Sequence, residues 1–585
     1  MPVTIERRPV VSQIPEALVP HPLLRQVYAR RRISDPDELS PALQRLLDPS
    51  LMRGMDQATT LLITMLQRQG RILVVADFDA DGATSCALAI SALQAMGFAH
   101  VDYIVPNRFQ FGYGLTPQIV ALALERQPDL LITVDNGISS LEGVAAARAA
   151  GVAVLVTDHH LAGASLPAAD AIINPNQPGC GFPSKALAGV GVVFYLMLAL
   201  RARLRESGWF TQRQIPEPNL ADCLDLVALG TVADVVPLDF NNRILVNEGL
   251  KRIRAGRCRP GILTLIEVAG RTREGLMAAD LGFALGPRLN AAGRLDDMSR
   301  GIECLLAGDV SQAHAIAIEL DGLNKDRKLI ESGMREQAFA ALQSLDLDDA
   351  SLPAGLCIYD PSWHQGVIGI LASRIKEHYH RPVIVFADAG ESGAEADELK
   401  GSARSVTGYH IRDALDDIAS REPGLIARFG GHAMAAGLSL RRADLPRFKA
   451  AFAEHAARHL DDESRQARIL TDGSVAAEDF CLGTAEVLLA GGPWGQGFPE
   501  PRFDGEFLLE DQRLVGERHL KLRVRPMDGS QSLDAIAFNI DTDHWPRTDV
   551  HRVRLVYRLD VNEFRGARAL QLMVEHMEAS PAEVT

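Results

Sequence analysis

Short apolar runs alternate with segments of helical spacing over the first third of the chain. Buried strands are predicted at RILVVADFD (71–79), DLLITVDNG (129–137) and GVAVLVTDHH (151–160), because each run is short and continuously apolar. Helices are predicted between them, at ATSCALAISALQAMG (83–97) and SLEGVAAARAAG (140–151). Strands that alternate with helices predict an α/β fold, with a parallel sheet covered by helices on both faces.

The pattern changes twice further along the chain. Residues 311–345 contain no Pro and predict one long amphipathic helix, followed by a smaller α/β unit with strands near AGLCIYD (354–360) and PVIVFAD (382–388). ERHLKLRVR (517–525) then alternates strictly, which predicts a small C-terminal antiparallel β-barrel. The predicted organisation is an N-terminal extension (1–50), a parallel-sheet domain (51–310), a connecting helix (311–345), a second α/β domain (346–465) and a barrel (466–585).

Length, composition and net charge limit the number of domains and the kinds of function that the chain can have. The 585 residues suggest three or four domains, and 47% hydrophobic residues can fill several cores. A net charge of −15 argues against a general nucleic-acid coat, which is usually basic. It does not exclude a local basic groove, because net charge describes the whole surface.

Several features predict a cytoplasmic protein without membrane contact. The seven cysteines form no CxxC pair, which favours reduced, scattered thiols. The N-terminal residues MPVTIERRPVV lack the apolar core of an export signal. The longest uncharged apolar stretch, 186–200, is shorter than the ~20 residues of a membrane helix and is predicted as a buried helix.

Acidic and histidine side chains cluster at the ends of the predicted strands. In a parallel sheet the carboxyl ends of neighbouring strands meet at one edge, where ligands bind. A further acid occurs in LVALGTVADVVPL (226–238). The candidates are Asp77, Asp79, Asp81, Asp135, Asp158, His159, His160 and Asp234.

Two other interpretations of DFDADG are weaker. A calcium loop would need Glu at its twelfth position, where the chain has Leu88, and it would not follow a strand. A helix N-cap with additional acids would account for Asp81 but not for all three carboxylates. The matching residues on the next two strands favour a functional site.

This set of side chains suits a hard or borderline divalent cation, Mn²⁺ or Mg²⁺. The carboxylates outnumber the ligands that one ion needs, and two ions ~3.5–4 Å apart are a device for phosphoryl transfer. Successive side chains of an extended segment point in opposite directions, so one histidine of the adjacent pair can bind metal while the other faces the substrate.

VADFDADG, TVDNG, TDHH and the acid of LGTVADVVPL together resemble the DHH phosphoesterase superfamily. From about residue 50 to its end, the chain is most similar to the single-strand-specific DNA exonucleases of that superfamily. The supporting segments are PNRFQFGYGL (106–115), GPRLNAAGRL (286–295), WHQGVIGI (363–370), GSARS (401–405), FGGHAMAAGL (429–438) and PWGQGFPEP (493–501). The fold implied is a DHH domain, a DHH-associated domain and an oligonucleotide-binding (OB-like) barrel.

The resemblance implies a role for each acidic and histidine residue. Asp135 is expected to bridge two ions, with His160 facing the scissile phosphate and Asp158 orienting a histidine. The remaining metal ligands are expected to divide into Asp77 and Asp79 on one ion, and Asp81, His159 and Asp234 on the other.

The resemblance also implies contacts with DNA. Each of these residues has an ordinary alternative: a surface salt bridge for an arginine, core packing for an aromatic residue, or a solvated strand face in the barrel. The expected contacts are Arg108, Tyr113, Arg288, Asn290, Ser402, Arg404, Gly431, His432, Lys521 and Arg523.

The expected function is therefore metal-dependent 5′→3′ degradation of single-stranded DNA to mononucleotides, in DNA repair and recombination. Single-strand-binding protein and a repair helicase are expected partners, and the chain is expected to be a monomer. Two alternatives stay open. One is a phosphodiesterase for short oligonucleotides or cyclic dinucleotides, or a pyrophosphatase. The other is a non-catalytic DNA-binding scaffold.

Overall fold

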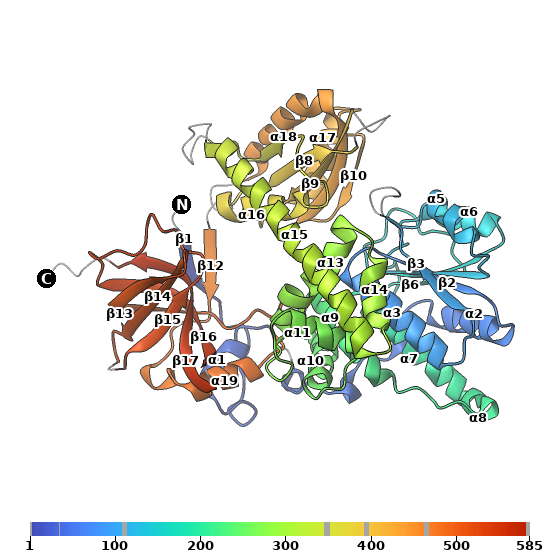
Figure 1. Cartoon of the computed structure of the whole chain (residues 1–585), viewed down its shortest axis with the longest axis horizontal. Coiled ribbons are helices and arrows are strands. Elements are labelled where there is room, and N and C mark those ends of the chain that lie inside the picture. Colours follow the sequence, from blue (N-terminus) through green and yellow to red (C-terminus); the bar gives the residue numbers. More distant parts are fainter. Residues whose placement is uncertain are drawn as a thin grey trace. The chain divides into compact units, whose positions relative to one another are not determined.

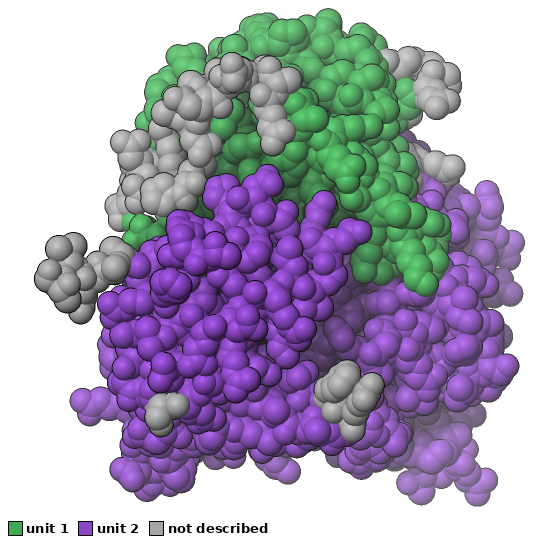
Figure 2. Space-filling model, turned by 60° about the vertical axis from the view of Figure 1, so that its left-hand side comes forward, with its two compact units in different colours: residues 1–6, 322–469 green, residues 7–321, 470–585 purple. Residues whose placement is uncertain are grey.

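A computed structural model describes residues 3–33, 35–107, 111, 114–343, 352–390, 397–460, 467–529, 531–564 and 566–580. The chain forms two compact units, coloured separately in Figure 2. One comprises Met1–Glu6 with Gly322–Ile469, and the other Arg7–Asp321 with Leu470–Thr585. The predicted parallel-sheet domain and nearly all of the predicted barrel thus belong to one unit, and the boundaries of the five predicted domains stay predictions.

The parallel sheet predicted near the N-terminus is present in the second of these units. Its strands, in spatial order, are β3 (Val101–Ile104), β2 (Ile72–Ala76), β4 (Leu130–Val134), β5 (Ala153–Thr157) and β6 (Ala171–Ile173). All neighbouring strands are parallel. In the register, Ala76 pairs with Val134, and Val134 with Thr157. The next residues along the chain, Asp77, Asp135 and Asp158, therefore leave the sheet side by side.

Helices cover both faces of this sheet (Figure 1). α5 (Pro117–Leu124) and α6 (Leu141–Ala149) share an apolar cluster with the odd-numbered residues of β2 and β4. α7 (Gly189–Glu206) packs on α2 (Met55–Gln67) and on α3 (Ala80–Ala95), and all three helices contact the sheet. The first half of α7 is almost entirely buried, which confirms the buried helix predicted for the apolar stretch 186–200.

A helical layer continues this unit beyond the sheet. It contains α8 (Trp209–Arg213), α9 (Leu224–Ala233), α10 (Phe240–Arg254), α11 (Pro260–Val268), α12 (Ala278–Asp280), the π-helical turn η5 (Leu281–Leu285), α13 (Gly286–Leu295) and α14 (Ser299–Leu306). The long helix α15 (Val310–Gln343) confirms the connecting helix predicted at 311–345, whose last two residues lie outside the described part of the chain.

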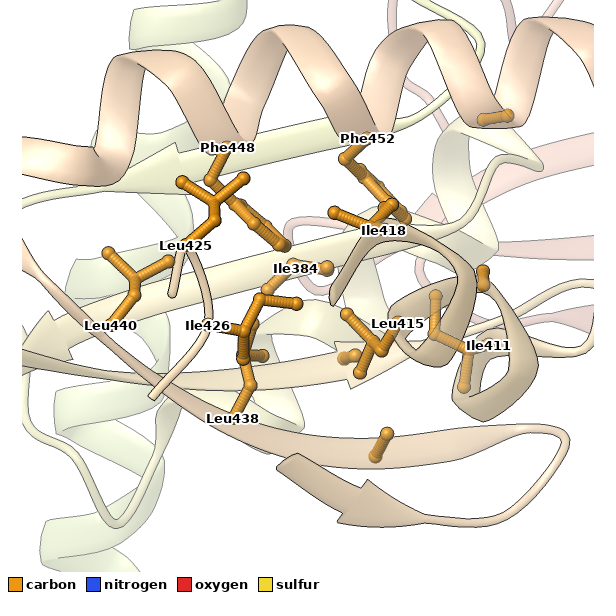
Figure 3. Close-up of a cluster of buried hydrophobic side chains, with 14 of the residues drawn as sticks. Ile384, Ile411, Leu415, Ile418, Leu425, Ile426, Leu438, Leu440, Phe448 and Phe452 are labelled. Atoms are coloured by element: carbon orange, nitrogen blue, oxygen red, sulfur yellow. The ribbon is translucent and has the colours of Figure 1, made fainter. Parts of the chain in front are cut away.

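The second α/β region is built on a mixed sheet. Its order is β10 (Arg428–Gly431), β11 (Ala435–Arg441), β9 (Glu398–Arg404), β8 (Val383–Asp388) and β7 (Leu356–Tyr359). The α-helices in the described residues of this region are α16 (Ile368–Tyr379), α17 (Ile411–Arg421) and α18 (Leu445–His459). Phe448 and Phe452 of α18 point toward the sheet, with Leu415 and Ile418 of α17 in the same core (Figure 3).

The C-terminal strands close into a barrel. Its order is β13 (Phe503–Val515), β14 (His519–Pro526), β15 (Leu533–Ala537), β17 (Ala567–Ala579) and β16 (Arg552–Phe564). The predicted antiparallel barrel is confirmed at four of its five strand pairs, whereas β15 and β17 run parallel. A closed ring with an odd number of strands cannot alternate in direction all the way round, so one parallel pair is required.

The N-terminal extension contacts residues 467–472. β1 (Val3–Arg7) pairs with β12 (Ala467–Thr471), and α1 (Pro22–Tyr28) is followed by the buried Arg31, whose guanidinium binds the carboxylate of Asp472 at 2.5 Å. All seven cysteines are free thiols. Within the described residues, no helix combines the length and hydropathy needed to cross a bilayer.

Candidate metal centre

The DFDADG segment connects β2 to α3 and places its three acids differently. Asp77 follows the last residue of β2 and is buried. Asp79 caps α3, because its Oδ1 accepts hydrogen bonds from the Asp81 and Gly82 N–H groups at 2.9 and 3.0 Å. The buried Asp81 carboxylate lies at the N-terminus of α7 and accepts hydrogen bonds from the Gly189 and Val190 N–H groups at 2.5 and 2.9 Å. A helix N-terminus favours a negative charge at this position.

Asp135 follows β4 in a conformation that few residues adopt. Its φ is +62°, in the left-handed region that Asp tolerates better than most non-glycine residues. The next residue, Asn136, fixes the turn, since its Nδ2 donates to the carbonyl groups of Val75 and Val134 at 3.2 and 2.9 Å. The TVDNG motif thus joins β2 and β4 at the edge where the acids emerge.

The Asp-His-His triplet follows β5 and holds its own imidazoles. Asp158 Oδ1 lies 2.7 Å from His160 Nδ1, and Asp158 Oδ2 accepts a hydrogen bond from the Ile138 N–H group at 2.9 Å. His159 turns toward the other acids, with its Nε2 3.1 Å from Asp135 Oδ1. The two rings nevertheless lie side by side, with centroids 4.4 Å apart, and His160 Nδ1 is 4.0 Å from the same Asp135 oxygen. They therefore do not point in the opposite directions that the alternation of side chains predicted.

Asp234 is placed by the C-terminal end of a helix. It is the C-cap of α9, and its Oδ2 lies 3.5 Å from His159 Nε2. Gly230, one turn earlier, lets α9 approach this closely: an added Cβ would lie 2.3 Å from Thr84 Oγ1 and 2.8 Å from Asp81 Oδ1. The LGTVAD motif is therefore a close helix contact followed by a carboxylate.

Among the residues that the structure describes, three groups of side chains have ligand atoms close enough to hold a metal ion. Within each group, one ligand atom per residue lies within 4.8 Å of the others. The groups are Asp77 with Asp79 and Asp135, Asp81 with His159 and Asp234, and Asp135 with His159 and His160. Asp135 belongs to two groups, and so does His159. The structure thus brings the predicted metal ligands together, and their division between two ions stays a prediction.

Electrostatics shows that this cluster suits cations. Burial, followed by the charges of neighbouring carboxylates, raises the pKa of Asp135 and of Asp234 well above the usual range. Burial and the charge of Asp79 raise the pKa of Asp81 to about 7, although two backbone N–H groups oppose the change. A divalent cation would remove the repulsion that raises these pKa values, so the residues present fit the metal.

In the pair of Asp158 and His160, each side chain stabilises the charged form of the other. Burial alone would raise the pKa of Asp158, but the hydrogen bond and charge of His160 outweigh it and lower that pKa. Burial alone would lower the pKa of His160, but the bond and charge of Asp158 outweigh it and raise that pKa. This pair matches the orienting role predicted for Asp158.

Two helix glycines that we did not predict as site residues let α13 and α7 approach the acidic cluster closely. An added Cβ on Gly293 of α13 would lie 1.9 Å from the Phe78 carbonyl oxygen, and one on Gly189 of α7 would lie 2.7 Å from Asp135 Cβ. Asn290, predicted to contact substrate, accepts a hydrogen bond from the Ala80 N–H group at 2.8 Å through its Oδ1. The glycines of the segments GPRLNAAGRL and ALAGVG were the sequence signal from which these close helix contacts could have been predicted.

The predicted DNA contacts of this unit are only partly described. Arg108 and Tyr113 lie outside the described residues. Arg288 Nη2 lies 2.8 Å from Asp321 Oδ1, and its Nη1 donates to the Ala284 carbonyl at 2.6 Å. The side chain is therefore held in place within the protein, and its contact with DNA stays a prediction.

In the other unit, Ser402 and Arg404, which are expected DNA contacts, lie on one side of β9. Arg404 Nη1 lies 3.3 Å from Ser402 Oγ, and burial lowers the pKa of Arg404. Gly431 has a φ of +140°, and an added Cβ would lie 2.5 Å from the Ala435 carbonyl oxygen, which explains the glycine. The neighbouring His432 is exposed.

On the barrel, the two faces of β14 are as predicted. Leu520, Leu522 and Val524 are buried, whereas the basic residues between them point outward. Lys521 Nζ lies 3.4 Å from Asp534 Oδ2, and Arg525 Nε lies 3.0 Å from Glu510 Oε1. These carboxylates offset part of the positive charge, although exposed ion pairs are weak.

The comparisons agree with this site. The chain matches the sequence models of the DHH family, N-terminal domain (residues 71–231), the DHHA1 domain (353–458) and the RecJ OB domain (471–576). The fold and the acidic edge of its sheet thus define a DHH phosphoesterase with a DHH-associated domain.

Similarity to particular relatives extends over nearly the whole chain. It is 56% identical over 574 residues to the single-stranded-DNA-specific exonuclease RecJ of Dickeya dadantii, and the alignment covers 98% of each chain. It is 53% identical over 577 residues to the single-stranded-DNA-specific exonuclease RecJ of Escherichia coli, and that alignment covers 98% of this chain and 99% of the relative. The crystal structure of RecJ in complex with Mn²⁺ from Thermus thermophilus matches with a TM-score of 0.80 and 31% identity, covering 99% of this chain and 80% of the other. The chain belongs to the RecJ family.

Proposed function

We propose that this protein is a metal-dependent exonuclease that degrades single-stranded DNA from the 5′ end to mononucleotides. The observation that carries the proposal is the convergence of Asp77, Asp79, Asp135 and His159 at one sheet edge, in a chain that belongs to the RecJ family. A cluster of this composition is chemically suited to phosphodiester hydrolysis.

The proposed ligands of the two ions, Mn²⁺ or Mg²⁺, are the six side chains of the cluster. Asp135 would be shared, with Asp77 and Asp79 on one side. The other side would comprise Asp81, His159 and Asp234. When bound, the ions would polarise the phosphodiester and lower the pKa of a water molecule.

His160 is the proposed catalytic side chain that faces the phosphate. Asp158 accepts a hydrogen bond from Nδ1 and so fixes the orientation of the ring. A ring bonded through Nδ1 presents Nε2 to a substrate. We assign Nε2 a hydrogen bond to the departing 3′ oxygen, which would stabilise the charge that develops there.

Binding of the strand is assigned to polar groups in both units. Ser402, Arg404, Gly431 and His432 supply hydroxyl, guanidinium, backbone and imidazole donors suited to phosphate. Arg108, Arg288 and Asn290 are proposed near the 5′ end, and Tyr113 is proposed as a further contact with the strand. On the barrel, Lys521 and Arg523 are proposed to follow the backbone of the strand, the common role of a basic OB face.

The setting of the reaction is also proposed. We infer a cytoplasmic protein of DNA repair and recombination that acts as a monomer, with single-strand-binding protein and a repair helicase as partners. Residues 51–310 would carry out hydrolysis, and residues 346–465 and 466–585 would bind the strand.

End-labelled single strands blocked at either terminus test the proposal. The protein is incubated with Mn²⁺, Mg²⁺ or chelator. We expect mononucleotides with either metal, none with chelator, and protection only by a block at the 5′ terminus. Protection only by a 3′ block would overturn the direction.

Two controls address the alternative functions. Cleavage confined to strands of a few nucleotides would indicate a phosphodiesterase for short oligonucleotides. An intact strand in the presence of either metal would indicate a scaffold.

A further inference from the structure

Phe283 is an aromatic side chain that the fold leaves in solvent. It is 87% exposed, whereas Leu329, the next most exposed large apolar side chain within the described residues, is 71% exposed. The other large apolar residues of η5, Leu281 and Leu285, are buried. A single exposed apolar side chain is ordinary on a protein surface, so the meaning of Phe283 depends on its position.

One side of η5 packs against the C-terminal end of α9. An added Cβ on Gly282 would lie 3.2 Å from Val232 Cγ1, and one on Gly286 would lie 3.0 Å from the Ala233 Cβ. Val232 and Ala233 are the last two residues before Asp234, which belongs to the acidic cluster. Phe283 is thus carried by a backbone segment in contact with the helical turn that presents a proposed metal ligand.

The helix that continues from η5 reaches the same cluster from another direction. In α13, Asn290 accepts a hydrogen bond from the Ala80 N–H group, and Gly293 contacts the Phe78 carbonyl. Phe78 and Ala80 lie between the acids of DFDADG. The segment 282–293 is therefore fixed to the end of α9 and to the DFDADG segment, and α13 contacts both α9 and α3.

A second exposed apolar side chain follows the proposed metal ligand Asp234 in the sequence. Val235 directly follows Asp234, is 62% exposed and has a φ of +63°, a conformation that β-branched residues rarely adopt. Apolar surface next to a cluster of carboxylates contributes nothing to metal binding. It suits the uncharged part of a nucleotide.

We infer that Phe283 stacks on a nucleobase of the single strand whose backbone is held at the acidic cluster. The inference rests on the proposed function and adds to it a contact with a base. Every base has an aromatic face, so stacking on Phe283 would position the strand without selecting its sequence. A ring fixed through η5 and α13 would also hold the adjacent phosphate at a constant distance from the metal ligands.

Steady-state kinetics on an unstructured single strand tests the inference. Phe283→Ala is expected to raise KM about tenfold, equivalent to about 1.4 kcal/mol, because base stacking is lost. Phe283→Trp, which keeps an aromatic face, is expected to retain the wild-type KM. Leu329→Ala, which removes another strongly exposed apolar side chain, serves as the control and is expected to change neither KM nor kcat.

Strands with one abasic site give a sharper test. At the position that meets Phe283, removing the base should raise the wild-type KM, and Phe283→Ala should add no further increase. In parallel, a strand with 2-aminopurine at that position, mixed with protein in chelator, should lose fluorescence with wild type and Phe283→Trp but not with Phe283→Ala.

An unchanged KM and unchanged quenching for Phe283→Ala, with an active wild type, would overturn this inference alone. A wild type that leaves the strand intact with Mn²⁺ would overturn the proposed function instead. The quenching experiment separates the two outcomes because it requires no cleavage.

Discussion

Asp135 is the residue on which most of the metal centre depends. It belongs to two of the three potential metal-binding groups, and its backbone lies in the left-handed region. Gly189 of α7 approaches it so closely that even a methyl group would collide with its Cβ. The chain therefore fixes this carboxylate from two sides, through the turn after β4 and through α7.

Asp135→Ala is expected to lower kcat for single-strand degradation by at least about 10³-fold, since it removes a charge-stabilising group from the reacting centre. Strand binding should be retained, because the proposed contacts in β9 and the barrel stay in place. Cleavage of labelled strands and fluorescence anisotropy measure the two effects.

Asp102→Ala is the matched control, because Asp102 is an exposed carboxylate on β3 that pairs with Arg126. It should behave as wild type. Equal activity of the Asp135→Ala and wild-type proteins would contradict the assignment of the metal centre.

At the scale of elements, the sequence predicts strands more reliably than it predicts what supports them. The apolar runs ending at Asp77, Asp135 and Asp158 are strands in the structure, since a buried parallel strand has a plain local signal. The origin of Asp234 in a helix and the contact of Asn290 with the Ala80 N–H group depend on tertiary packing. No spacing along the chain encodes such contacts.

The barrel shows the same limit to what the sequence alone can predict. The alternation in β14 predicts which residues are buried, but it does not reveal that carboxylates on neighbouring strands pair with its basic residues. Nor does local alternation determine that β15 and β17 run parallel, because that follows from closing the ring.

The contact of α13 with the DFDADG segment gives a prediction at this scale. Gly293→Ala places a Cβ 1.9 Å from the Phe78 carbonyl oxygen, so the helix must shift away from the acidic loop. We expect a loss of about 1–3 kcal/mol in the free energy of unfolding, as is typical of overpacking, and a lower kcat.

Gly322→Ala is the control for this substitution, because Gly322 lies within α15 and an added Cβ there meets nothing within 4 Å. It should be neutral or stabilising, since Ala favours a helix. Denaturant unfolding and activity assays compare the two variants, and equal stability of both would refute a tight contact at Gly293.

For the whole molecule, the acidic cluster links metal binding to stability. Carboxylates that raise one another's pKa repel in the metal-free protein. An ion that binds only the folded state stabilises it by about 2.7 kcal/mol at a concentration 100 times its Kd.

Mn²⁺ should therefore raise the Tm of the wild-type protein by several degrees relative to chelator, and Asp135→Ala should lose most of that increase. Differential scanning fluorimetry with Mn²⁺, Mg²⁺ and chelator measures the effect. An equal rise in Tm for the wild-type and Asp135→Ala proteins would show that the stabilising ions bind at another site.

The ion pair between Arg31 and Asp472 has a consequence for the order of folding. The two residues are 441 positions apart, and both are buried. At about 5–20 residues per second, a ribosome needs roughly 20–90 s between making the first and the second. During that interval the guanidinium of Arg31 stays hydrated or meets other partners, so the segment around Arg31 reaches its native place only after Asp472 has been made.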